Sequence, residues 1–143
     1  VNSYRRLSRN TAAPINIEWG TDNRTVGIRS PIASAQARRV ENRVIGADAN
    51  PYVAMAMTLA CGYLGMKNKI KPKAEMKGDG YQSPYALPRS LGEALDWLRR
   101  ETDLHDVLGK EFITVYTEVK ELEFDEFMTV ISPWEREHLL LHV

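Results

Sequence analysis

The sequence predicts an α+β fold, with about three antiparallel strands followed by four helices. In the first 45 residues, apolar and polar side chains alternate in short runs, which is the period of a strand with one buried face. From residue 50 onward, apolar residues recur at helical spacing, and residues that favour helix starts precede several of these runs. At 143 residues, the chain has the length of one ordinary domain.

The expected strands lie in the N-terminal part and cover residues 15–19, 25–29 and 38–44. Residues 20–23 have the composition of a turn, so we expect the first two strands to pair as an antiparallel hairpin. Arginine lies on or beside the polar face of each strand, which predicts a sheet with one basic face and one packed face. Alternation places five side chains on the packed face: Ile15, Ile17, Trp19, Val26 and Ile28.

The expected helices run from Pro51 to about Lys69, from Ser90 to Glu101, from Lys110 to about Thr129 and from Trp134 to His142. Asn50 is a favourable N-cap for the first helix, and Pro51 suits its first position. This helix is apolar nearly all round, so we expect it to be buried on most sides, with Cys61 inside. Residues 70–89 show no sustained period and predict a long surface loop, and residues 103–108 predict a short turn.

Charge is distributed unevenly along the chain. The formal net charge is zero, which argues against a general binder of nucleic acids or membrane surfaces. Residues 1–43 nevertheless contain eight arginines and no lysine. The planar guanidinium group suits bidentate contacts with carboxylate or phosphate oxygens, so these ligands are expected in the N-terminal part.

Cys61 is the single cysteine, which excludes an internal disulfide framework and fits a reducing compartment. The longest apolar stretch, residues 52–66, is too short to span a bilayer, and the chain start does not resemble a signal peptide. We therefore expect a soluble, cytoplasmic protein. Val1 stands where an initiator methionine would be, so we also expect the chain to be a fragment of something larger.

The stretch from Arg39 to Arg43 carries the most specific arrangement of charges. In an extended chain, Arg39, Glu41 and Arg43 point to one side, which places a carboxylate between two guanidinium groups. Glu41 can ligate a metal ion there, and the arginines can bind polyanionic oxygens. Phosphoryl transfer needs little more than such positioning and charge neutralisation. The alternative is a surface strand with an ordinary salt bridge.

Four motifs in order resemble the C-terminal part of the glutamine synthetase catalytic domain: Asn2–Leu7, Asn23-Arg24 with Ile28–Pro31, Arg38–Arg43 and Ala49–Tyr52. The resemblance is strong over residues 1–69 and weak after Ala94. It implies that residues 1–143 are the C-terminal portion of that domain, with an arginine-rich stranded part at 1–45 and a mainly helical part at 50–143. The N-terminal domain and the upstream catalytic half would then be absent.

The resemblance also implies roles for individual residues. In this family the γ-carboxylate of glutamate is activated by ATP with Mg²⁺ or Mn²⁺ and is then attacked by ammonia or an amine. The remaining metal ligands would lie upstream, and an adjacent subunit of a homo-oligomeric ring would complete the site. Arg6 would bind the glutamate carboxylate, Arg24 the transferring phosphoryl group, Arg29 and Arg39 the nucleotide phosphates, Glu41 the metal, and Arg43 the reacting side of glutamate.

One position departs from the family pattern. Members that use ammonia commonly carry a glutamate two residues before the proline that corresponds to Pro14, and this chain has Ala12 there. The group that would bind and deprotonate ammonium is therefore missing. This favours a γ-glutamyl-amine or polyamine ligase of the family. Glutamine synthesis is the first alternative, and a non-catalytic relative that retains only the fold is the second.

Overall fold

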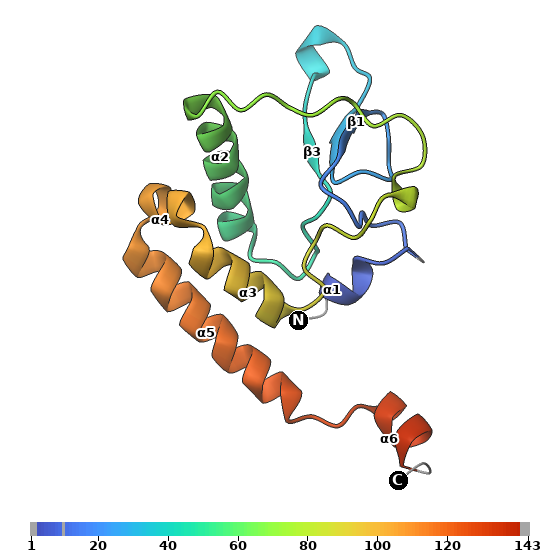
Figure 1. Ribbon diagram of the computed structural model, residues 1–143, viewed down its shortest axis with the longest axis vertical. Coiled ribbons are helices and arrows are strands. Elements are labelled where there is room, and N and C mark those ends of the chain that lie inside the picture. The colour runs from blue at the N-terminus through green and yellow to red at the C-terminus, as the bar shows by residue number, and fades with distance from the viewer. Residues whose placement is uncertain (1–2, 10, 141–143) are drawn as a thin grey trace. The chain divides into compact units, whose positions relative to one another are not determined.

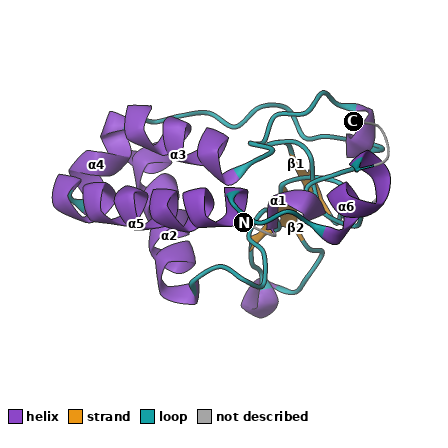
Figure 2. Cartoon of the chain, turned by 90° about the horizontal axis from the view of Figure 1, so that it is seen from below, coloured by secondary structure: helices purple, strands orange, loops and turns teal. Residues whose placement is uncertain are grey.

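The computed structural model of the chain describes residues 3–9 and 11–140, and it divides after Ser90 into two compact units. The predicted α+β class is confirmed, since short strands are confined to the N-terminal part and helices predominate after it (Figures 1 and 2). The elements up to Ser90 are α1 (Ser3–Arg6), β1 (Trp19–Thr21), β2 (Ile28–Ser30), the 3-10 turn η1 (Ala35–Ala37), β3 (Glu41–Asn42), α2 (Pro51–Lys67) and the 3-10 turn η2 (Gly80–Gln82). The later elements are α3 (Leu91–Arg100), α4 (Thr102–Leu108), α5 (Lys110–Met128) and α6 (Pro133–Leu139).

The three strands form one mixed sheet in the order β1-β2-β3. β2 and β3 are antiparallel, as predicted, and their register places Arg29 opposite Glu41. β1 and β2 are parallel, with Trp19 opposite Ile28, so the predicted hairpin between the first two strands is wrong.

The buried side chain of Asn16 explains the parallel pairing. Its Nδ2 donates to the carbonyl of Thr25 at 3.1 Å, and its Oδ1 accepts from the backbone N–H of Gly27 at 3.3 Å. Residues 25–27, which lie between β1 and β2, are therefore bound beside Asn16, which precedes β1. The chain then enters β2 in the same direction as β1. Gly27 permits this approach, because a Cβ at that position would lie 2.6 Å from the carbonyl oxygen of Asn16.

The core of the first unit includes residues that precede β1 in the sequence and residues that connect β1 to β2. Ile15 and Val26 are fully buried, which confirms their predicted orientation. Ile17 is 57% exposed, so the predicted alternation over residues 15–19 fails there. The failure has the same cause as the parallel pairing, because the side chain of Asn16 points into the protein and makes hydrogen bonds with the backbone.

Residues 70–89 form a long connection, as predicted, but they are tied to the N-terminal part at several points. Backbone N–H groups of Met76 and Ala86 donate to the carbonyls of Trp19 and Ile15, each at 2.9 Å. The indole Nε1 of Trp19 donates to the carbonyl of Lys73 at 2.8 Å. The connection thus lies along residues 15–21.

Helix α2 begins as predicted, since the Asn50 side chain accepts from the backbone N–H groups of Tyr52 and Val53. The predicted burial is wrong: Ala60 is the one buried residue of this helix, and Cys61 is exposed. A helix that is apolar on all sides needs cover on all sides, and the described residues leave much of its surface exposed. Among these residues, no helix is long and apolar enough to cross a membrane.

The second unit is helical. α3 packs on α5, where Gly92 leaves room for the ring of Phe124. Residues 103–108, predicted as a turn, belong to the helix α4, because the chain after Glu101 resumes helical geometry at once. α6 begins with a capping box in which Ser132 and Glu135 bind each other's backbone N–H. The predicted end of this helix at His142 lies outside the described residues.

Candidate functional site

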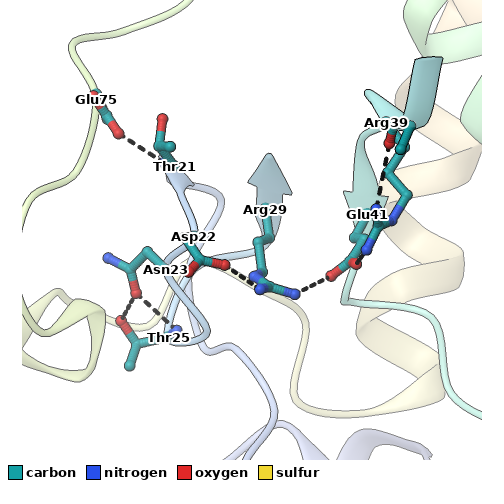
Figure 3. A network of polar contacts seen from close by, with 9 residues as sticks. Thr21, Asp22, Asn23, Thr25, Arg29, Arg39, Glu41 and Glu75 are labelled. Carbon is teal, nitrogen blue, oxygen red and sulfur yellow. Dashed lines mark hydrogen bonds and ion pairs between the residues drawn. The ribbon is translucent and has the colours of Figure 1, made fainter. Parts of the chain in front are cut away.

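Arg29, on β2, is the centre of a chain of charged groups (Figure 3). Its Nη1 donates to Oε2 of Glu41 at 2.9 Å, across the antiparallel pair β2–β3. Its Nη2 donates to the carboxylate of Asp22, which follows β1. The Arg29 side chain is 13% exposed, so a largely buried guanidinium group is held between two carboxylates that come from different segments.

These contacts fix the ionisation of both partners. The hydrogen bonds that Arg29 donates to Asp22, and next to Glu41, raise the pKa of Arg29 above its ordinary value. The hydrogen bond from Arg29, and to a smaller degree the charges of Arg29 and Arg39, lower the pKa of Glu41. Glu41 is thus held as a carboxylate, which is the form that ligates a cation.

Arg39 lies on the other side of the same carboxylate. Its Nη2 is 3.3 Å from Oε1 of Glu41, which agrees with the predicted orientation of both residues to one side of the strand. The Arg39 side chain is 55% exposed and its guanidinium is accessible to an anion from solvent. Each oxygen of Glu41 therefore already faces one arginine.

Arg6 and Arg43 bind the backbone of neighbouring segments. The guanidinium of Arg6, in α1, donates to the carbonyls of Arg43, Val44 and Ile45 at 2.7–3.3 Å. Arg43 Nη2 donates to the carbonyl of Ala12 at 2.8 Å. The structure therefore links α1, residues 11–13 and the strand that carries Glu41 through two of the arginines predicted to bind a substrate.

Arg24 lies apart from this network. It is exposed on the connection between β1 and β2, and no described residue binds its guanidinium. Its neighbours Asn23 and Thr25 are fixed, because the Asn23 side chain accepts from the N–H and the hydroxyl of Thr25. The backbone at Arg24 is thus ordered while the guanidinium is available to a ligand.

Two donors of the network are unused. Nε of Arg29 and Nε of Arg43 are buried and have no hydrogen-bond partner among the described residues. An unpaired buried donor is costly, so such groups call for an acceptor. Within the described part of the chain, no group of three or more His, Cys, Asp or Glu side chains could hold a metal ion. A metal ion bound at Glu41 would therefore need further ligands from outside the described residues.

Three residues that shape this site were not predicted from the sequence. Asp22 appeared only as part of a turn, and its contact with Arg29 follows from the parallel pairing of β1 and β2. Asn16 appeared only as the polar residue of an alternating strand. Tyr81 had no assigned role, yet its hydroxyl donates to the carbonyl of Thr11 at 2.9 Å. No local pattern in the sequence indicates these long-range contacts.

Comparison with known families gives a match over nearly the whole chain. The model of the family described as "Glutamine synthetase, catalytic domain" matches residues 1–139. This range includes every residue of the charged network described above.

Individual proteins of known name are also similar to this chain. A glutamate–isopropylamine ligase from Pseudomonas sp is 37% identical over 94% of this chain and 30% of its own length. A glutamine synthetase from Methanococcus maripaludis is 36% identical over 98% of this chain and 33% of its own length. A gamma-glutamylethanolamide synthetase from Streptomyces coelicolor is 32% identical over 94% of this chain and 29% of its own length. The chain thus spans about a third of the length of the curated relatives it matches.

Proposed function

Because the chain belongs to the family of glutamine synthetase catalytic domains, we propose that it forms part of an ATP-dependent ligase that joins the γ-carboxylate of glutamate to a primary amine. The observation that supports this most directly is the ionised Glu41 between Arg29 and Arg39. Phosphoryl transfer from ATP uses cationic groups and carboxylates that hold a metal ion, and it requires little other chemistry from the protein.

The position of each arginine suggests which ligand it would bind. We assign Arg29 and Arg39 to the nucleotide phosphates, since they flank the carboxylate that would hold the metal. Arg24, whose guanidinium is free among the described residues, would contact the transferring phosphoryl group. Arg43 and Arg6 would bind glutamate, with Arg43 at the reacting carboxylate. Arg6 already donates to backbone carbonyls, so it would contribute through its remaining N–H groups or by exchanging one of these contacts.

The residues present fit a divalent metal ion in part. Glu41 has the required charge, and Mg²⁺ or Mn²⁺ would be bound through it together with ligands outside the described residues. The bound ion would neutralise charge on the phosphates of ATP. To accept the ion, Glu41 has to share an oxygen with it or release one arginine, and the released guanidinium would then face the phosphates.

We further propose that residues 1–143 are the C-terminal portion of a larger catalytic domain whose upstream half supplies the other metal ligands. The relatives are about three times as long as this chain. The exposed apolar side chains of α2 also support this, because such a surface is normally covered by further protein. In the whole protein, copies would form a ring in which an adjacent subunit completes each site.

Ala12 supports an amine larger than ammonia as the acceptor. No carboxylate stands at this position to bind and deprotonate ammonium, and the side chain that is present is small and exposed. Two of the relatives are named for larger amines, isopropylamine and ethanolamine. Glutamine synthesis from ammonia is the alternative, favoured by the relative named glutamine synthetase at 36% identity. A non-catalytic role is disfavoured because the charged network is intact.

The test is an assay of the full-length protein that carries these residues. ATP-dependent ADP release is measured with glutamate plus ammonia, isopropylamine, putrescine or ethanolamine. We expect turnover to be fastest with one of the larger amines. Fastest turnover with ammonia would establish the alternative, and absence of turnover with every amine would overturn the ligase assignment.

The Glu41→Ala variant tests the metal assignment in the same assay. We expect metal-dependent turnover to be abolished and binding of Mn²⁺, followed by electron paramagnetic resonance, to weaken. Glu75→Ala is the matched control, because Glu75 is also a carboxylate of lowered pKa but binds Thr21 instead of an arginine. A rate within a few-fold of the wild type for Glu41→Ala would show that the metal assignment is wrong.

A further inference from the structure

The main chain of residues 11–13 is held in place from several directions. Tyr81 Oη donates to the carbonyl of Thr11 at 2.9 Å, and Arg43 Nη2 donates to the carbonyl of Ala12 at 2.8 Å. The Thr11 hydroxyl donates to the carbonyl of Arg6 and accepts from the N–H of Ala13 at 3.2 Å. Two successive carbonyls are thus fixed by side chains that come from distant parts of the sequence.

Tyr81 can act as an anchor because its own position is fixed. It lies in η2, where the Asp79 side chain accepts from the Tyr81 N–H at 2.9 Å. The preceding Gly80 is buried, its N–H donates to the Thr25 hydroxyl at 2.7 Å, and its carbonyl accepts from Asn16 at 2.9 Å. A Cβ on Gly80 would lie 2.6 Å from the carbonyl oxygen of Thr25, so a side chain is not accommodated there.

A second tyrosine, Tyr85, lies in the same loop, and among the described residues its hydroxyl makes no hydrogen bond to residues 11–13. The ring of Tyr85 lies between the guanidinium groups of Arg9 and Arg89, at 5.2 and 4.8 Å from its centroid. Within the described part of the chain, the Tyr85 hydroxyl accepts one long contact of 3.4 Å, from the backbone N–H of Arg9. Ring packing therefore anchors Tyr85, whereas hydrogen bonding by the hydroxyl connects Tyr81 to the site.

We propose that Tyr81 is a positioning residue for the acceptor amine, because it fixes the backbone that presents Ala12 beside Arg43. This rests on the proposed function, in which Arg43 holds the carboxylate that the amine attacks. Attack requires the amine and the carboxylate to be held in a defined geometry, and small displacements reduce the rate strongly. The chain supplies that geometry on the amine side through the hydrogen bonds of Tyr81 and Arg43 to adjacent carbonyls.

The test compares Tyr81→Phe with Tyr85→Phe in the full-length enzyme. Both variants keep the ring and lose one hydroxyl, and only Tyr81→Phe loses a hydrogen bond to residues 11–13. Removing one hydrogen bond of ordinary strength corresponds to about a three- to tenfold effect. We expect KM for the amine to rise by about that factor in Tyr81→Phe, with KM for ATP and for glutamate within about twofold. Tyr85→Phe is expected to leave all three unchanged.

Hydrogen–deuterium exchange gives a readout that is independent of turnover. We expect the peptide that covers residues 11–16 to exchange faster in Tyr81→Phe than in the wild type or in Tyr85→Phe. An unchanged KM for the amine, an equal rise in all three KM values, or equal behaviour of the two variants would overturn the positioning role alone. A wild-type enzyme without turnover on any amine would overturn the proposed function and this inference with it.

Discussion

Glu41 lies directly opposite Arg29 in the antiparallel pair β2–β3, and its Oε2 accepts a hydrogen bond of 2.9 Å from Arg29 Nη1. Directly opposite residues in such a pair have side chains close enough to interact, so the backbone register itself sets this contact. Asp22 holds the other end of the same guanidinium. The orientation of Arg29 thus depends on one residue of the recognised motif and on one outside it.

Asp22→Asn tests this dependence. The amide keeps the shape of the carboxylate and loses its charge, so Arg29 loses a charge-assisted hydrogen bond and with it part of its fixed orientation. We expect KM for ATP to rise about three- to tenfold in the full-length enzyme, with KM for glutamate nearly unchanged. Isothermal titration with a non-hydrolysable ATP analogue provides a measurement that does not depend on turnover.

Asp96→Asn is the matched control, because Asp96 also pairs with an arginine, Arg99, at 3.5 Å on an exposed helix surface. Exposed pairs of this kind contribute little, so we expect no change in the binding of nucleotide. Equal effects of the two substitutions, or an unchanged affinity for the analogue in Asp22→Asn, would show that Asp22 does not orient Arg29 for nucleotide.

The pH dependence of Glu41 follows from the same contact. Its pKa is lower in the folded chain than in the unfolded chain, chiefly because of the hydrogen bond from Arg29. The Arg29–Glu41 pair therefore stabilises the fold at pH values above the ordinary range of glutamate, and this contribution is lost as the pH falls through the lowered pKa. We expect an NMR titration of the Glu41 carboxyl carbon to show a midpoint below that range.

Substituting Arg29 should raise the pKa of Glu41 again. In Arg29→Gln we expect the Glu41 midpoint to move upward, toward the ordinary value. The midpoint of Glu75 should stay in place, since its pKa is lowered by contacts with Thr21 that do not involve Arg29. A Glu41 midpoint that does not respond to Arg29→Gln would contradict the assigned cause.

Much of the charged site could be predicted from the sequence, because its residues lie in short motifs whose spacing is visible in one dimension. Alternation placed Arg39, Glu41 and Arg43 on one side of an extended segment. The structure agrees for Arg39 and Glu41, but the second arginine beside the carboxylate is Arg29, while Arg43 binds the carbonyl of Ala12. The antiparallel pairing of β2 with β3 also agrees with the antiparallel sheet predicted from local patterns. The family assignment came from the same motifs and is confirmed over residues 1–139.

What the sequence could not predict depends on side chains that bind distant backbone. The pattern predicted Asn16 as an exposed polar residue of an alternating strand. Its side chain is instead buried and binds the backbone of Gly27 and Gly80, which lie 11 and 64 positions further along the chain. With these contacts in place, β1 pairs with β2 in parallel and not in the predicted antiparallel hairpin, and Asp22 lies beside Arg29. Helix α2 was mispredicted for a different reason. Its apolar composition predicts burial, but the composition does not indicate which part of a larger protein would pack on the helix.

Asn16→Ala tests the structural role of this residue. The substitution leaves the N–H groups of Glu18 and Gly27 and the carbonyl of Thr25 without the partner that Asn16 supplies, whereas the carbonyl of Gly80 keeps its hydrogen bond from the N–H of Ser83. Each buried polar group that loses its partner lowers the free energy of unfolding by about 1–3 kcal/mol, and partial access to water reduces this loss. We expect the free energy of unfolding to fall by about 2–4 kcal/mol, measured by denaturant titration.

Gln36→Ala is the control for this measurement, since Gln36 is exposed in η1 and its substitution should change stability by less than about 0.5 kcal/mol. Asn16→Asp sharpens the test, because aspartate keeps the acceptor oxygen and loses the donor to Thr25 and Gly80. A destabilisation by Asn16→Ala no larger than that of Gln36→Ala would show that the hydrogen bonds of Asn16 do not hold the strand connection.

Ala12→Glu tests the assignment of the acceptor. The carbonyl of Ala12 is held by Arg43, and its side chain is exposed, so a longer side chain is accommodated without strain in the core. A glutamate there would place a carboxylate beside the proposed site of attack, where it can bind ammonium and remove its proton. It would also occupy space that a larger amine requires. We therefore expect kcat/KM for ammonia to rise at least tenfold and kcat/KM for the preferred amine to fall.

The control for this prediction is Ala12→Gln, which adds the same bulk without the charge. If bulk alone excludes the larger amine, Ala12→Gln should lower kcat/KM for that amine about as much as Ala12→Glu does, while leaving kcat/KM for ammonia near the wild-type value. The gain with ammonia should then be specific to the carboxylate, and it should disappear as the pH falls below the pKa of the introduced group, since the protonated acid neither attracts ammonium nor accepts its proton. A gain with ammonia that is equal in both variants would mean that position 12 selects the acceptor by size and not by charge.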